Sequence, residues 1–333
     1  MNMWGVKRKT WNVEGDKGAA MRAFVTFHVP RFTFIARVFI PRILPYHRGQ
    51  YIWNETGTGM NPTRAARRTI CQTFDALKAR KQIGLVPFIP AGYPDLATTA
   101  AALPALESAG ASAIEVGFPF SDPIADGPTI QESFTAALEK KLKIADIFAT
   151  VRQARPGVSI PLVAMVSYSI VFRYGVAHFV AEAKSCGFDG LIVPDLPPPE
   201  AQGICDIIRS GGLDTILMVA PSTAPERRAE IARLSSGFVY YLSVSGITGE
   251  RDQLPADLAE NVRQLKGLTD RPICVGFGIS QARHVAQLQG LADGAIVGSG
   301  VVKRMKSHVQ GGPAAIAAAL ADYSRELLSQ VRR

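Results

Sequence analysis

The chain has 333 residues, 47% of them hydrophobic, and a mean hydropathy of +0.11, as expected for a globular protein with a large core. Its net charge of +9 belongs to residues 1–68, which hold 12 Lys/Arg and three Asp/Glu, whereas residues 69–333 hold 25 of each kind. Because the body of the chain is neutral, the basic pI of 9.5 does not indicate nucleic-acid binding.

The four cysteines lie far apart and form no Cys-x-x-Cys pair, which argues against a zinc site and against a disulfide framework. They are Cys71, Cys186, Cys205 and Cys274. This usage favours a reducing compartment, and we expect the protein to be cytoplasmic.

Residues 1–68 form a basic extension that differs in character from the rest. Arg31, Arg37 and Arg42 interrupt its apolar runs, so none approaches the ~18 residues of a membrane span. Its prolines fit a secretory signal poorly, and residues 1–59 lack the serines of a transit peptide. We expect translation to begin near Met60 and the extension to be poorly ordered or not translated. An intact mass of the full 35.8 kDa from the native gene would contradict this.

From residue 69 onward, short apolar runs alternate with longer amphipathic stretches, which predicts strands alternating with helices. In chain order we expect helix 70–81, strand 85–89, helix 97–109, a strand through Glu115, helices 129–139 and 144–155, strand 162–166, helix 176–185, strand 190–193, helix 200–210, strand 215–219, helix 224–234, strand 238–242, helix 256–266, strand 273–275, helix 281–289, strand 295–297 and helix 313–331.

Eight strands, each followed by a helix over about 265 residues, predict an α/β fold with a buried parallel sheet, namely a single-domain TIM (β/α)8 barrel at 69–333. The alternative is an open doubly wound sheet. That fold would place a Gly-rich phosphate turn after the first strand, where the chain instead has Pro90-Ala91-Gly92-Tyr93.

Two glycine turns follow the last two strands, at 276–278 and 298–300. Bare glycines let backbone N–H groups approach an anion, and in this fold these loops often bind phosphate. The alternative is that the glycines only ease tight turns.

Glu115 ends a short apolar run, and Asp126 lies about ten residues further on in the turn-rich segment that follows. A buried run seldom carries a carboxylate without a role, and two acids in different environments can act as proton donor and base. Structural alternatives remain open. Glu115 could be a structural carboxylate whose hydrogen bonds are satisfied within the fold, and Asp126 could cap the turn before Gly127. For Asp122 and Asp195 a structural use, or for Asp122 an interface use, is favoured.

Other candidate side chains are less informative. Tyr240 could face the barrel interior by strand alternation, where core packing would also explain it. His178, His284 and His308 fall in helical stretches, so we expect each on the solvated surface, and we find no metal-ligand set. No His-Glu-x-x-His, Gly-x-Ser-x-Gly or P-loop motif occurs.

With these residues in view, 69–333 resembles the alpha chain of tryptophan synthase. The resemblance rests on Val86-Pro87-Phe88, Glu115-Val116-Gly117-Phe118-Pro119-Phe120-Ser121-Asp122-Pro123, Ala125-Asp126-Gly127-Pro128-Thr129-Ile130-Gln131, Phe172-Arg173-Tyr174-Gly175, Asp195-Leu196-Pro197, Gly246-Ile247-Thr248-Gly249, Gly276-Phe277-Gly278-Ile279-Ser280 and Ala295-Ile296-Val297-Gly298-Ser299. The long motif around Glu115 is highly specific, whereas the glycine loops alone would fit several phosphate-binding barrels.

The resemblance implies retro-aldol cleavage of indole-3-glycerol phosphate to indole and glyceraldehyde 3-phosphate, without a cofactor in this chain. By position, Glu115 would be the acid–base group at indole C3, and Asp126 would accept a hydrogen bond from the indole N–H. The remaining residues implied for the site are Thr248, which would contact Asp126 on loop closure, Gly249, Gly278, Gly298 and Ser299 for the phosphate, and Phe88, Ile130, Met165, Ile192 and Tyr240 for the indole pocket.

The resemblance also implies a partner, the pyridoxal-phosphate beta chain of an alpha2-beta2 tetramer, facing loop 121–126 and the loop after the third strand. That second loop departs from the family's usual Tyr-Tyr-Asn-Pro, since this chain has Ser167-Tyr168-Ser169-Ile170. We expect the chemistry to survive this change and the beta-chain contact to differ in detail.

Two other functions compete with this interpretation. One is a sugar-phosphate isomerase or epimerase, whose sites usually recruit Lys, His, Cys or metal ligands that the apolar strand ends here do not offer. The other is a regulatory subunit that activates a beta chain without cleaving substrate, against which the intact Glu115 and Asp126 argue.

Overall fold

The computed structural model describes residues 67–123, 126–243, 254–276 and 278–331, together with the backbone of three strands nearer the N-terminus. The chain divides into two compact units, Met1–Arg64 and Ala65–Arg333. Among the described residues, no helix has both the length and the apolar character that a membrane span requires.

The first unit contains an antiparallel sheet in the order β1-β2-β3. Its strands are β1 (Trp11–Glu14), β2 (Arg22–Val29) and β3 (Phe32–Phe39). We did not predict these strands, although aromatic and β-branched residues dominate β2 and β3, a composition typical of strands. That residues 1–68 are poorly ordered or not translated stays a prediction.

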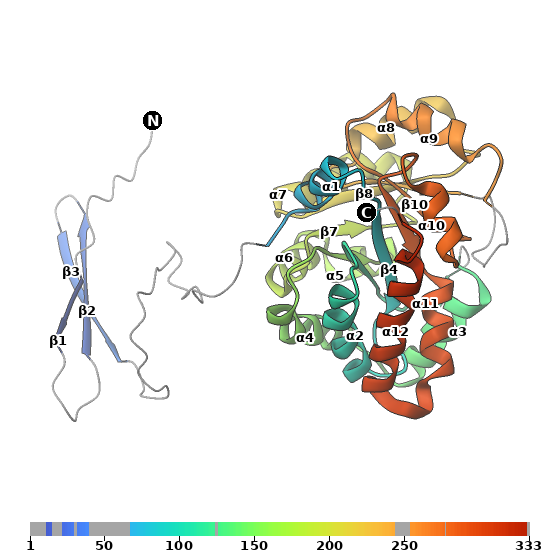
Figure 1. Cartoon of the computed structure of the whole chain (residues 1–333). Helices are drawn as coiled ribbons and strands as arrows, with labels where there is room; N and C mark the ends of the chain where they lie inside the picture. Colours follow the sequence, from blue (N-terminus) through green and yellow to red (C-terminus); the bar gives the residue numbers. More distant parts are fainter. Residues whose placement is uncertain are drawn as a thin grey trace. The chain divides into compact units, whose positions relative to one another are not determined.

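The second unit is a closed barrel of eight parallel strands in the order β10-β11-β4-β5-β6-β7-β8-β9 (Figure 1). The strands are β4 (Gly84–Pro90), β5 (Ile114–Gly117), β6 (Leu162–Met165), β7 (Gly190–Ile192), β8 (Asp214–Val219), β9 (Val239–Leu242), β10 (Ile273–Gly276) and β11 (Gly294–Val297). Because the last strand, β11, pairs with the first, β4, the sheet has no free edge. The prediction of a TIM barrel is therefore confirmed, and the alternative of an open doubly wound sheet is wrong.

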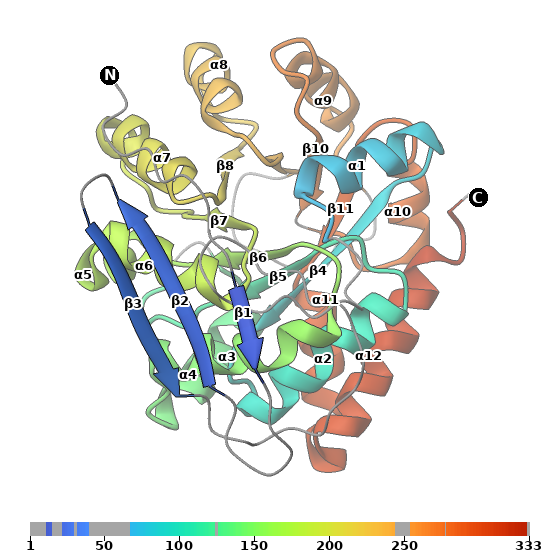
Figure 2. The same cartoon turned by 90° about the vertical axis from the view of Figure 1, so that its left-hand side faces the viewer.

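Helices surround the barrel in both views (Figures 1 and 2). They are α1 (Ile70–Ala79), α2 (Leu96–Ser108), α3 (Pro128–Glu139), α4 (Ile144–Ala154), α5 (Tyr168–Tyr174), α6 (Val176–Cys186), α7 (Ala201–Ser210), α8 (Pro225–Leu234), α9 (Leu258–Lys266), α10 (Ala282–Leu288), α11 (Ser299–Ser307) and α12 (Gly312–Leu328), with short 3-10 turns η1 (Arg155–Gly157), η2 (Pro198–Glu200) and η3 (Val309–Gly311). The sequence prediction missed α5 and α11, and it placed the other helix ends within a few residues of those observed.

The core has an outer layer between strands and helices and an inner layer inside the barrel. Helix α1 closes the inner layer at the amino ends of the strands, because Ile70 and Phe74 belong to the inner cluster. A Cβ at Gly84 or Gly294, at the start of β4 and β11, would lie 2.9 or 3.0 Å from the Phe74 ring. Glycine at the start of these two strands therefore leaves room for the Phe74 ring of α1.

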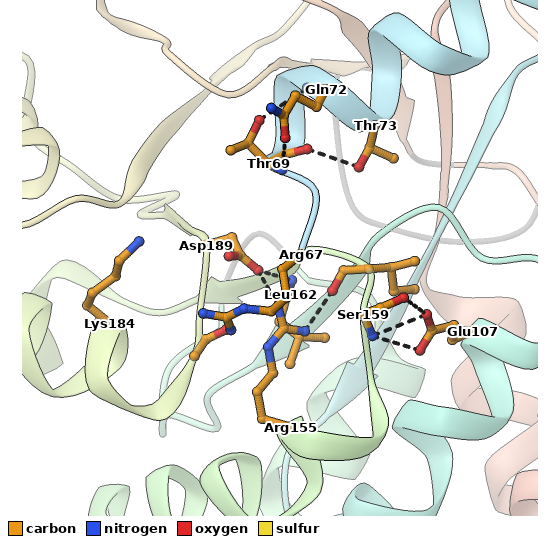
Figure 3. Close-up of polar contacts among 12 residues, drawn as sticks. Arg67, Thr69, Gln72, Thr73, Glu107, Arg155, Ser159, Leu162, Lys184 and Asp189 are labelled. Carbon is orange, nitrogen blue, oxygen red and sulfur yellow. Dashed lines mark hydrogen bonds and ion pairs between the residues drawn. The ribbon is translucent and has the colours of Figure 1, made fainter. Parts of the chain in front are cut away.

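A buried ion pair lies at the same end of the barrel (Figure 3). Arg155 and Asp189 are 2.8 Å apart, with side chains only 4% and 14% exposed. The Arg155 guanidinium also donates to the Ile160 carbonyl at 2.7 Å, and the Asp189 carboxylate accepts from the Leu162 N–H at 3.0 Å. The pair thus joins α4 and η1 to the first residues of β6 and β7.

Replacing Asp189 by Ala should lower the free energy of unfolding by about 3–5 kcal/mol, because it removes the carboxylate that is paired with the buried Arg155 guanidinium. Urea denaturation measures this loss. Asp322→Ala is the matched control, since its ion pair with Arg325 is largely exposed and such pairs contribute about 0–1 kcal/mol. Equal losses in the two variants would show that the buried pair has no special role.

Candidate active site

Glu115 points into the barrel from the middle of β5. Its neighbours along the strand, Ile114 and Val116, pack in the outer core layer, so alternation directs Glu115 inward. It pairs in register with Phe88 of β4 and Val163 of β6, which are both members of the inner cluster. Only 1% of Glu115 is exposed to solvent.

The environment of Glu115 favours its protonated form. Burial, and secondarily repulsion from Asp126, raise the pKa of Glu115 to about 8. Within the part of the chain that the structure describes, its Oε2 atom has no hydrogen-bond partner. A buried carboxyl that holds its proton near neutral pH, with one oxygen unused, is suited to donate that proton to a bound substrate.

Asp126 lies in the loop between β5 and α3, next to Gly127, the N-cap residue of α3. Its N–H donates to the Pro123 carbonyl at 3.0 Å, and its own carbonyl accepts from Gln131 Nε2 at 2.7 Å, so the loop backbone is held from α3. Burial raises the pKa of Asp126 to about 6. Asp122, in contrast, is exposed and accepts a hydrogen bond from the Ser121 hydroxyl.

Five apolar or aromatic side chains from five different elements meet in the inner cluster around these acids. They are Phe88, Ile130, Met165, Ile192 and Tyr240, the residues that the resemblance implied for an indole pocket. Since they come from β4, α3, β6, β7 and β9, the fold brings together positions spread over more than 150 residues of sequence.

Tyr240 faces the barrel interior. Burial, followed by repulsion from Glu115 and Asp126, raises the pKa of Tyr240 well above its usual value, so its phenol is neutral beside both acids. A Cβ at Gly276 of the adjacent strand β10 would collide with the Tyr240 hydroxyl. Gly276 therefore makes room for the Tyr240 ring. The sequence had indicated only that Gly276 belongs to a glycine turn.

The two glycine turns lie at the carboxyl ends of β10 and β11. Gly278 has φ +76°, a conformation that L side chains rarely adopt. Gly298 is the N-cap residue of α11, and Ser299 is the first residue of that helix. A Cβ at Gly298 would lie 3.6 Å from Ile130 and 3.8 Å from Phe88, so the N-terminus of α11 borders the apolar cluster. Thr248 and Gly249, expected on the loop after β9, lie outside the described residues.

The loops after β6 and β7 are tied together by Asp195. Its carboxylate accepts from the Ser167 hydroxyl and from the Tyr168 N–H, each at 2.7 Å. Ser167 is also the N-cap residue of α5 and contacts the Ser169 hydroxyl at 2.9 Å. The structural use that we favoured for Asp195 is therefore observed, and the unusual serines of this chain take part in it.

The surface position expected for His284 is wrong, because this side chain is fully buried. Its Nδ1 atom accepts from the Ser280 N–H at 3.3 Å. Its place four residues before the buried Leu288, on the same face of α10, was the signal to its burial. His178 and His308 are exposed, as expected. Among the residues described, no three His, Cys, Asp or Glu side chains are grouped so as to hold a metal ion.

These features define a TIM barrel with two interacting carboxyl groups and with glycine loops at the carboxyl ends of the strands, where enzymes of this fold build their active sites. The family model for the tryptophan synthase alpha chain matches residues 74–331, and the chain belongs to that family.

Similar proteins agree with the family match. The tryptophan synthase alpha chain of Synechocystis sp. is 42% identical over 263 residues, covering 79% of this chain and 98% of that protein. The alpha chain of Rhodopirellula baltica is 45% identical over 240 residues, or 71% and 86% of the two chains.

Solved structures show the same likeness. A tryptophan synthase structure from M. tuberculosis, in an aminoacrylate-bound form, aligns with a TM-score of 0.70 at 35% identity over 80% of this chain and all of that one. The alpha subunit from Pyrococcus furiosus gives 0.69 at 38%, over 74% and 98%.

Family membership assigns the chain the lyase step of tryptophan biosynthesis, in which indole-3-glycerol phosphate is cleaved to indole and glyceraldehyde 3-phosphate. The indole passes to a beta chain, which condenses it with serine. The sugar-phosphate isomerase or epimerase alternative is therefore wrong.

Proposed function

We propose that Glu115 and Asp126 carry out this cleavage as an acid–base pair. The observation that supports the proposal best is the environment of Glu115, whose unused Oε2 atom and pKa of about 8 leave a proton available inside the barrel. Asp126, with a pKa of about 6, is ionised over much of the range in which Glu115 is protonated. The two groups thus differ in the way that a proton donor and an electrostatic partner must differ.

The reaction then proceeds in two balanced steps. Glu115 donates its proton to indole C3, which makes that carbon tetrahedral and places a positive charge on the ring nitrogen. The Asp126 carboxylate accepts a hydrogen bond from the ring N–H and stabilises this cation. The Glu115 carboxylate next takes the proton of the adjacent glycerol hydroxyl. The bond between indole C3 and the glycerol carbon breaks, its electrons return to the ring, and indole and the aldehyde leave with Glu115 protonated again.

The remaining site residues bind the two ends of the substrate in this proposal. Phe88, Ile130, Met165, Ile192 and Tyr240 hold the indole ring. The phosphate is held by backbone N–H groups at Gly249, Gly278, Gly298 and Ser299, helped by the N-terminus of the nine-residue helix α11. Thr248 contacts Asp126 when the loop after β9 closes and excludes water.

The scheme needs no cofactor in this chain, and pyridoxal phosphate belongs to the beta-chain partner. We propose an alpha2-beta2 tetramer in the cytoplasm, with loop 121–126 and the loop after β6 facing the partner. The exposed apolar side chain of Phe172, 65% accessible and 5.8 Å from the Tyr168 ring on α5, supports this placement. The mass of the complex purified from co-expressed chains measures the stoichiometry.

The rate of indole release should have a bell-shaped dependence on pH. The profile of kcat/KM should rise through about pH 6, as Asp126 ionises, and fall through about pH 8, as Glu115 loses the proton it must donate. Because the two acids interact, the apparent pKa values read from the profile belong to the pair and not to either residue alone. Initial rates between about pH 5 and pH 9, with circular dichroism to confirm folding, measure the profile. Activity that keeps rising well above pH 8 would rule out Glu115 as the acid.

A further inference from the structure

The backbone of Ser280 is held at both its N–H and its carbonyl by buried side chains outside the reaction scheme. The Tyr323 hydroxyl, from α12, donates to the Ser280 carbonyl at 2.8 Å. On the amide side, the Ser280 N–H donates to His284 Nδ1 at 3.3 Å. Tyr323 is 4% exposed and His284 is fully buried. Ser280 lies two residues after Gly278, so both contacts fix the loop that follows β10.

The same tyrosine also contacts the second glycine turn. A Cβ at Gly300, the second residue of α11, would collide with the Tyr323 hydroxyl. The guanidinium of Arg304, one turn further along α11, lies 4.8 Å from the centroid of the Tyr323 ring. Helices α10 and α11 both pack against α12 (Figures 1 and 2). One side chain of the closing helix therefore touches both loops.

We infer that Tyr323, assisted by His284, is a positioning residue for the substrate phosphate. By holding the Ser280 carbonyl and the first turn of α11 in contact with one hydroxyl, it sets the separation at which the N–H groups of the two loops converge on one anion. Such donors bind most tightly when they need no rearrangement. The inference rests on the proposed phosphate site.

The test replaces Tyr323 by Phe, which removes only the hydroxyl. The KM for indole-3-glycerol phosphate, and in the reverse direction the KM for glyceraldehyde 3-phosphate, should rise about fivefold to tenfold. The KM for indole and the value of kcat should stay within about twofold, because the indole pocket and Glu115 are untouched.

Tyr241→Phe is the matched control. The Tyr241 hydroxyl is also buried and, among the described residues, has no hydrogen-bond partner, so its removal should leave all these constants unchanged. A second pair of variants tests the contact of His284 with the Ser280 N–H. His284→Asn keeps an acceptor near the position of Nδ1 and should retain phosphate affinity, whereas His284→Leu should lose it. Thermal unfolding of every variant separates these effects from a loss of stability.

Gly298→Asp tests the phosphate site itself, because it adds a negative charge where the anion is proposed to bind and the site has room for the Cβ. A large rise in KM for Gly298→Asp with no change for Tyr323→Phe would overturn the inference alone. No change for Gly298→Asp would overturn the phosphate site as well. A rise in the KM for indole equal to that for glyceraldehyde 3-phosphate in Tyr323→Phe would show a general structural effect and would also overturn the inference.

Discussion

Replacing Glu115 by Gln should lower kcat for indole release by about 10²- to 10⁴-fold, the usual contribution of a positioned acid–base group. Glutamine keeps the size and polarity of the side chain but cannot give the proton to C3 or take one from the hydroxyl. The assay is indole release from indole-3-glycerol phosphate by the purified chain, with and without a beta chain. Glu132→Gln is the control, because Glu132 is exposed and pairs with Lys306 on the surface.

The same substitution should stabilise the fold. The pKa of Glu115 rises on folding to about 8, so burial favours the protonated form. The stability that this raised pKa contributes is complete below the unfolded-state pKa of about 4.5 and is lost as pH rises through about 8. At pH 8 the neutral amide should therefore add roughly 2–4 kcal/mol to the free energy of unfolding.

Stability and activity together decide between explanations. An inactive and more stable Glu115→Gln chain supports the proposed role, whereas an inactive and unstable one would point to misfolding. Full activity in this variant would refute the mechanism. Failure of the wild-type chain to release indole even beside a beta chain would favour the regulatory alternative instead.

Much of the barrel could be predicted because its signals are local. Continuous apolar strands alternating with helical stretches, most of them amphipathic, specify the eight β/α units. Helix α5 is only seven residues long, between Ser167 and Gly175, which is too short for periodicity to show. Helix α11 begins directly after Gly298, where the sequence suggests a turn and the chain continues as a helix.

The candidate site was predictable only as a set of residues. Glu115 stands out because an acid in a buried run is unusual, and Asp126 because a turn follows. Their different environments depend on burial and on each other, which are properties of the folded barrel. The contact between Tyr323 and Ser280 joins positions 43 residues apart, and nothing near either residue in the sequence indicates it.

Replacing Asp126 by Asn should lower kcat/KM by about 10²- to 10³-fold, the cost of removing one preorganised group that faces the developing charge. Asparagine keeps an oxygen that can accept the indole N–H, so this variant loses the charge and preserves the hydrogen bond. Asp126→Ala loses both and should be slower still. If Asn retained full activity, the carboxylate charge would be unnecessary, and the cationic intermediate would need another stabilising group.

Asp122→Asn is the matched control for this prediction, because it makes the same chemical change in the same loop at an exposed side chain. Since loop 121–126 is proposed to face the beta chain, the two variants are compared in the isolated chain. The pH profile provides a second readout. A substrate phosphate also ionises near pH 6, so the low-pH limb of the wild-type profile has two possible origins. If Asp126 is one of them, Asp126→Asn should flatten or shift that limb and keep the limb near pH 8 that belongs to Glu115. An unchanged low-pH limb would assign it to the substrate and leave Asp126 as a hydrogen-bond acceptor whose ionisation does not control the rate.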